Sequence, residues 1–130
     1  SCSQAVFSVF APQLEVSDEV AFKIASPFGG GIALQGETCG AVTGALLALG
    51  LKYGPGKGEA NDKMYEISQQ FMQRFTEVNA STTCKQLIHF DISQPAELQA
   101  ADQAQVFQKI CPGLVASAAG IVQSMLSSKA

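Results

Sequence analysis

The stretch that decides the fold runs from Gly29 to Tyr53 and reads GGGIALQGETCGAVTGALLALGLKY. It joins a glycine-rich loop to a segment with almost no polar side chain, and Cys39 stands at the junction. Thr38 is expected to cap the helix that follows, because its hydroxyl can accept a backbone N–H, and Gly54 offers a stop. A helix that is apolar all round is typical of a buried position, so we expect a central core helix here.

Small side chains recur along this helix. Gly40, Gly44 and Ala48 are spaced by four residues and therefore share one face. Glycine inside a helix costs roughly 1 kcal/mol relative to alanine, so the pattern indicates the close approach of another backbone. The helix is shorter than the about 20 apolar residues that a bilayer requires, so no membrane span is expected. An alternative is a homodimer in which this face and the last helix pack against a second copy of the chain, although a monomeric core explains both features.

Elsewhere the chain reads as helices separated by turns. Ser17 and Asn61 are N-cap candidates, while Pro95 and Pro112 fit the first position of a helix. Apolar residues at helical spacing predict further helices over residues 1–14, 17–27, 61–78, 84–90, 96–110 and 112–126. No strand-like alternation is visible. We therefore expect an all-α fold in a single domain over residues 1–130, a compact bundle of about five to six helices with the glycine-rich loop before the buried central helix.

Charge and length limit the classes of partner that we expect for the chain. The chain has 130 residues and a formal net charge of −3, without a basic run, so nucleic acid is not an expected partner. No targeting segment is visible, which favours the cytoplasm. Cys2 stands so close to the first residue that residues are expected to be missing upstream, which leaves the periplasm open.

The candidate functional residues are four cysteines: Cys2, Cys39, Cys84 and Cys111. No pair forms CxxC, which excludes zinc-ribbon, rubredoxin and thioredoxin motifs. Each cysteine falls at the predicted start of a helix, where backbone N–H groups are unpaired and the dipole is positive. We therefore expect the thiol pKa values to fall below the ordinary value of about 8.5. Thiolates are the ligands of metal ions and iron–sulfur clusters.

The segments SCSQAVF, FGGG, GETCGAVTGALLALGLKYG, TCKQLI and CPGLV resemble the C_GCAxxG_C_C family of redox-active proteins, in order and over nearly the whole chain. That family is defined by four cysteines and a GCAxxG or CGAxxG motif, which stands here as Cys39-Gly40-Ala41-Val42-Thr43-Gly44. The resemblance implies that Cys2, Cys39, Cys84 and Cys111 are the family's four positions, with Gly40 beside them at the site. It also implies a redox partner protein, either an oxidoreductase or transporter-associated. Some members carry twin-arginine export signals, which imply a prosthetic group inserted before export.

Three hypotheses follow for the four cysteines. In the first they bind an iron–sulfur cluster, with [2Fe–2S] favoured, in an electron carrier or sensor rather than a substrate-converting enzyme. In the second they form two thiol–disulfide pairs without a cofactor, and in the third they are ligands of a structural zinc ion or merely buried thiols. His89, about a turn and a half past Cys84, is expected to be a surface or cap residue.

Overall fold

The computed structural model describes residues 1–127, and the all-α prediction is confirmed for them. Two short 3-10 turns, Pro12–Leu14 and Ser26–Phe28, accompany the α-helices. The α-helices are α1 (Cys2–Phe10), α2 (Asp18–Ala25), α3 (Gly40–Tyr53), α4 (Asp62–Asn79), α5 (Cys84–Ile88), α6 (Pro95–Gln103), α7 (Val106–Lys109) and α8 (Cys111–Ser127). Six of these eight described helices have eight residues or more, in line with the expected five to six. The single domain stays a prediction, and its residues 128–130 lie outside the described part.

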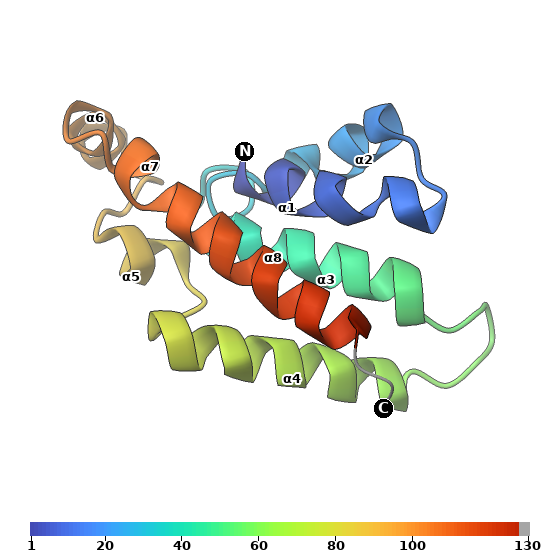
Figure 1. The fold of residues 1–130 in the computed structure, drawn as a ribbon. Helices are drawn as coiled ribbons and strands as arrows, with labels where there is room; N and C mark the ends of the chain where they lie inside the picture. Colours follow the sequence, from blue (N-terminus) through green and yellow to red (C-terminus); the bar gives the residue numbers. More distant parts are fainter. Residues whose placement is uncertain (128–130) are drawn as a thin grey trace.

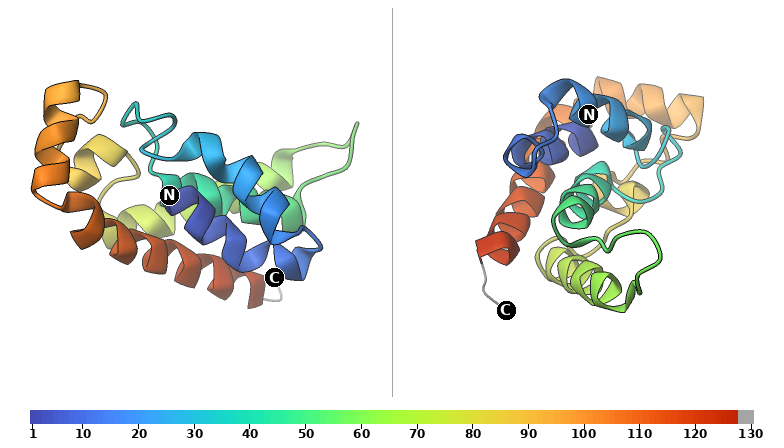
Figure 2. Two further views of the ribbon diagram at one scale, coloured as in Figure 1. Left: turned by 90° about the horizontal axis from the view of Figure 1, so that it is seen from above. Right: turned by 90° about the vertical axis from the view of Figure 1, so that its right-hand side faces the viewer.

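α3 is the central helix of the bundle. Figure 1 shows α1 and α2 on one side of it, α4 on the other, and α8 crossing in front. The right-hand view of Figure 2 shows the same arrangement end-on, with α3 in the middle. Its buried residues cover somewhat more than half of its circumference: Gly40, Ala41, Val42, Gly44, Ala45, Ala48 and Leu49. The expected buried central helix is therefore confirmed, and its apolar sequence is explained by neighbours on several sides.

The small-residue face of α3 is occupied by α1 of the same chain. A Cβ atom added to Gly44 would lie 2.6 Å from the carbonyl oxygen of Ser3, and one added to Gly40 would lie 3.0 Å from the Ser3 nitrogen. Side chains at these positions would push α1 away. The close backbone approach is confirmed, and this face is not available to a second copy of the chain.

Several predicted helix ends are confirmed and three expectations are wrong. One is Pro112, which is the second residue of α8 and not its first, because the helix begins at Cys111. Ser17 accepts a hydrogen bond from the Val20 N–H at 3.2 Å, and Pro95 is the first residue of α6. Thr38 does not cap α3, because the cap is Cys39 and Thr38 lies in an isolated antiparallel bridge with Thr83. The predicted continuous helix over residues 96–110 is wrong, because the helix is interrupted. Gln105 adopts φ 55°, a left-handed conformation that cannot continue an α-helix, so α6 and α7 are separate.

The glycine-rich loop makes a left-handed turn over residues 30–34. Gly30, Gly31, Ile32, Ala33 and Leu34 have φ between 53° and 70°. The turn is closed by backbone hydrogen bonds from the Ala33 N–H to the Pro27 carbonyl and from the Glu37 N–H to the Gly31 carbonyl, both 2.8 Å. Glycine adopts this conformation freely, but Ile32, Ala33 and Leu34 do so against the preference of L-amino acids.

The helical run Val106–Ser127 is long and apolar enough to cross a membrane by length and composition. The core helix of a water-soluble protein passes the same test. Within this run, α8 packs against α1, α3 and α4 and buries Leu114, Ala118, Val122 and Met125. The expectation that the chain has no membrane span stays a prediction.

Candidate functional site

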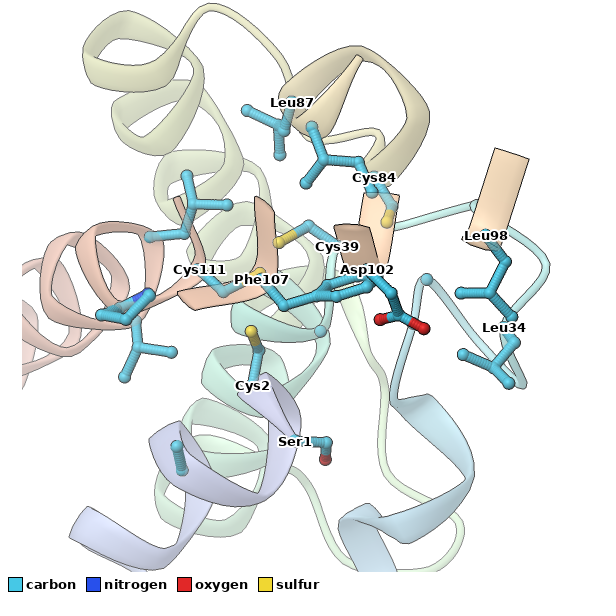
Figure 3. A pocket seen from close by; sticks show the side chains of 18 residues that line it. Ser1, Cys2, Leu34, Cys39, Cys84, Leu87, Leu98, Asp102, Phe107 and Cys111 are labelled. Atoms are coloured by element: carbon cyan, nitrogen blue, oxygen red, sulfur yellow. The ribbon is translucent and has the colours of Figure 1, made fainter. Parts of the chain in front are cut away.

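All four cysteines lie at the start of a helix, as the sequence predicted. Cys2, Cys84 and Cys111 are the first residues of α1, α5 and α8, and Cys39 is the N-cap of α3. The folded chain brings these four helix starts together. Figure 3 shows the four sulfur atoms pointing toward a common space.

That space is a cavity of about 690 Å³ whose wall includes all four cysteines and Gly40. It lies between two apolar clusters of the core. Cys39 belongs to the larger cluster, formed mainly by α1, α3, α4 and α8, and Cys84 belongs to the smaller one around α5, α6 and α7. The other lining residues are mostly apolar: Ser1, Ala5, Gly30, Gly31, Leu34, Leu87, Ile88, Leu98, Asp102, Phe107, Pro112, Leu114 and Val115.

Cys39 and Cys84 are held beside each other by backbone hydrogen bonds. The Cys39 N–H donates to the Thr82 carbonyl at 2.8 Å, and the Cys84 N–H donates to the Glu37 carbonyl at 2.6 Å. The two bonds flank the Thr38–Thr83 bridge. Sequence reasoning missed this short pairing because no alternating strand pattern surrounds it. The one available signal is a β-branched threonine directly before each of these two cysteines.

The glycine-rich loop forms the wall beside Cys84. A Cβ atom added to Gly31 would lie 2.7 Å from the Cys84 Cβ, and Gly31 also has φ 70°. The lack of space therefore requires glycine at this position, and the left-handed backbone favours it.

The expected lowering of the thiol pKa values is wrong for three of the four cysteines. Burial raises the pKa of Cys39, and it raises that of Cys84 to about 11, with a smaller contribution from the neighbouring thiols. The Cys2 thiol donates a hydrogen bond to the Cys111 sulfur, which raises the pKa of Cys2 and lowers the pKa of Cys111. The free energy required to remove a thiolate from water is larger than the stabilisation that the helix start provides.

All four cysteines are free thiols. Within residues 1–127, no three His, Cys, Asp or Glu side chains form a group that could hold a metal ion as they stand. The sulfurs fall into two neighbouring sets: Cys2 with Cys111, joined by their hydrogen bond, and Cys39 with Cys84, joined by the backbone.

Lys85 and His89 accompany Cys84 on α5: Lys85 follows it directly, and His89 lies at the end of the helix. The Lys85 Nζ lies 3.7 Å from Glu37 Oε1 and 3.8 Å from Asp91 Oδ1, so Lys85 links the segments that precede Cys39 and follow α5. Sequence reasoning missed Lys85, and its position next to Cys84 was the only signal. His89 is exposed and forms the C-cap of α5, which confirms the expected surface or cap role.

The chain was compared with known families and proteins. The model of a family described as "Putative redox-active protein (C_GCAxxG_C_C)" matches residues 1–125, a range that includes the four cysteines and the CGAxxG motif. Comparison with curated proteins and with solved structures finds no match.

Proposed function

The chain belongs to this family of redox-active proteins, and we propose that its four cysteines bind an iron–sulfur cluster that carries or senses electrons. The observation that carries the proposal is the convergence of Cys2, Cys39, Cys84 and Cys111 on one largely apolar cavity. Its redox partner would be another protein, an oxidoreductase or a transporter-associated protein.

The donor set suits such a cluster. Four cysteine sulfurs complete the coordination of a [2Fe–2S] or a [4Fe–4S] cluster, and we favour [2Fe–2S]. The cavity of about 690 Å³ has room for several atoms between the sulfurs. The Ala41 N–H donates a hydrogen bond to the Cys39 sulfur, which is the type of contact that tunes a cluster's potential. When bound, the cluster would supply one-electron transfer.

The residues of the chain have three tasks in this function. The cysteines give up their protons when they become ligands, and the raised pKa values mean that protons are released on binding. The apolar wall limits the contact of water with the buried Cys39 and Cys84 sulfurs. The Thr38–Thr83 bridge fixes Cys39 relative to Cys84 before anything binds.

The test is anaerobic purification followed by reconstitution with iron and sulfide. The expected product has visible absorption that bleaches with dithionite, and about two iron and two sulfide per chain for [2Fe–2S]. Replacing any of the four cysteines by serine should lower the iron and sulfide content. His89→Ala is the control and should leave both unchanged, because His89 is exposed and does not line the cavity. A colourless product without iron or sulfide would overturn the proposal, and zinc alone would point to a structural site.

A second function, thiol–disulfide exchange, is favoured by the hydrogen bond between Cys2 and Cys111. In this exchange a dithiol pair reduces a partner's disulfide: the pair becomes a disulfide, and the partner receives two electrons and two protons. Mild oxidation should remove two titratable thiols and join Cys2 to Cys111 in the peptide map. Four free thiols in protein exposed to oxidant would count against this function.

A further inference from the structure

The cavity extends beyond the four sulfurs. Its volume of about 690 Å³ falls within the roughly 300–1,000 Å³ typical of small-molecule sites. A cluster bound to the cysteines would be a compact group of few atoms, and much of the wall belongs to other residues. Leu34 from the glycine-rich loop, Leu98 from α6 and Phe107 from α7 form an apolar region of this wall.

One carboxylate accompanies this apolar region. Asp102 of α6 lines the cavity, and in the view of Figure 3 its carboxylate lies between the cysteines and Leu34. No ion pair among residues 1–127 involves Asp102. Asp102 is exposed and Leu34 is half exposed, so this end of the cavity is open to solvent. The Ser1 ammonium lies at the other end of the wall, beside Cys2. At the open end, an apolar wall with one carboxylate is complementary to an apolar molecule with one positive charge.

We propose that this cavity binds a small apolar amine, with its hydrocarbon body against Leu34, Leu98 and Phe107 and its ammonium group at Asp102. Burial of the hydrocarbon body favours binding of any apolar molecule of this size. The carboxylate selects among such molecules by charge, since it attracts an ammonium group and repels a carboxylate. The site goes beyond the proposed electron transfer and does not require a cluster, because its residues are separate from the cysteines.

The glycine-rich loop supports this assignment. A Cβ atom on Gly30 would overlap the Leu34 Cδ2, so the Leu34 side chain folds directly over Gly30 at the cavity wall. Leu34 reaches this place through the left-handed backbone of residues 30–34. Proteins retain such unfavourable conformations mainly at functional sites, ligand clamps among them.

The test uses three probes that share one hydrocarbon body: naphthylmethylamine, naphthylmethanol and naphthylacetate. Their affinities are measured by calorimetric titration at neutral pH and low salt, on both the metal-free reduced protein and the reconstituted protein. We expect the amine to bind about threefold more tightly than the alcohol, and the alcohol about threefold more tightly than the acetate, as suits a charge that solvent partly screens.

Two substitutions separate the charge from the apolar wall. Asp102→Asn should make the affinities for the three probes nearly equal, and Leu98→Ala should weaken all three. Glu77→Gln removes an equal charge from the exposed face of α4 and should change nothing. Circular dichroism checks that each variant is folded.

Three outcomes would overturn the proposal. The first is equal affinity for the three probes, the second is an order of affinities that Asp102→Asn does not change, and the third is no binding of any probe. Loss of amine binding on reconstitution would also overturn it, because the two ligands would then share one space. Failure of cluster assembly alone would leave the amine site standing, since the metal-free protein is measured separately.

Discussion

At the scale of single residues, Ile32, Ala33 and Leu34 are three consecutive L-residues in a left-handed conformation. Each has φ between 53° and 66°, and a left-handed conformation costs an L-residue roughly 1–2 kcal/mol. Ile32 is β-branched, which makes this conformation still less common. The loop is held by its own backbone hydrogen bonds and by Leu34 packing on Gly30.

Ala33→Gly is expected to stabilise the protein. Glycine removes the left-handed penalty at φ 53° but loses more entropy on folding, so the net gain in the free energy of unfolding should be about 0.5–1 kcal/mol. Urea denaturation followed by circular dichroism measures it. Ala116→Gly is the matched control at an exposed position within α8, and there we expect a loss of about 1 kcal/mol. Destabilisation by both substitutions would contradict the left-handed turn.

Cys84 shows which of two opposing effects decides its pKa. A helix N-terminus stabilises a nearby negative charge by about 0.3–1 kcal/mol. The rise of the Cys84 pKa from 9.0 to about 11 corresponds to about 2.7 kcal/mol in the other direction. Burial therefore outweighs the helix start. The sequence places a cysteine at a helix terminus correctly but says little about how deeply the folded chain will bury it.

At the scale of helices, the contact of α1 with α3 positions Cys2. Ser3, the next residue, lies against Gly40 and Gly44, and its hydroxyl donates to the Ala25 carbonyl of α2 at 2.9 Å. Three helices thus meet at one buried serine. Any change that moves α1 away from α3 also moves the Cys2 sulfur relative to the other three.

Gly44→Ala is expected to lower the free energy of unfolding by about 2 kcal/mol, because the new Cβ would lie 2.6 Å from a backbone oxygen that cannot rotate away. Gly50→Ala in the same helix is the control. An added Cβ there meets nothing within 4 Å, so alanine should be neutral or stabilising by up to about 1 kcal/mol. Equal effects of the two substitutions in urea denaturation would contradict the close packing of α1 on α3.

The sequence predicted most of the helices and the grouping of cysteines at helix starts. It did so because apolar spacing, N-caps and prolines are local signals, and Ser17 and Pro95 act as expected. It did not predict the Thr38–Thr83 bridge, since pairing between segments 45 residues apart has no local pattern. The break at Gln105 was also missed, because nothing in the sequence distinguishes a glutamine with a left-handed backbone from one inside a helix.

At the scale of the whole molecule, the buried thiols make stability depend on pH in the metal-free reduced protein. The unfolded chain loses the Cys84 proton near pH 9, whereas the folded chain keeps it until about pH 11. The stabilisation is therefore fully present below about pH 9 and is lost as pH rises toward about 11. We expect the free energy of unfolding to fall over this range, by at most about 1.4 kcal/mol per pH unit for this thiol.

Circular dichroism during urea denaturation is the suitable measurement, because the chain has no tryptophan. Lysine and tyrosine groups also titrate at high pH, so the informative quantity is the difference between the natural chain and Cys84→Ser. The variant should show the smaller decline, because serine does not ionise in this range. Identical slopes would mean that the Cys84 thiol has the same pKa in the folded and unfolded chain.

The wall of the cavity contains residues that lie far apart in the sequence. Cys2 and Cys111 are in contact although their residue numbers differ by 109. During synthesis the N-terminal half therefore emerges without a complete set of four thiols. The site exists only after residue 111 has left the ribosome and the start of α8 has docked. Whatever binds there meets a finished fold, and it slows unfolding of the whole chain rather than guiding the first steps of its formation.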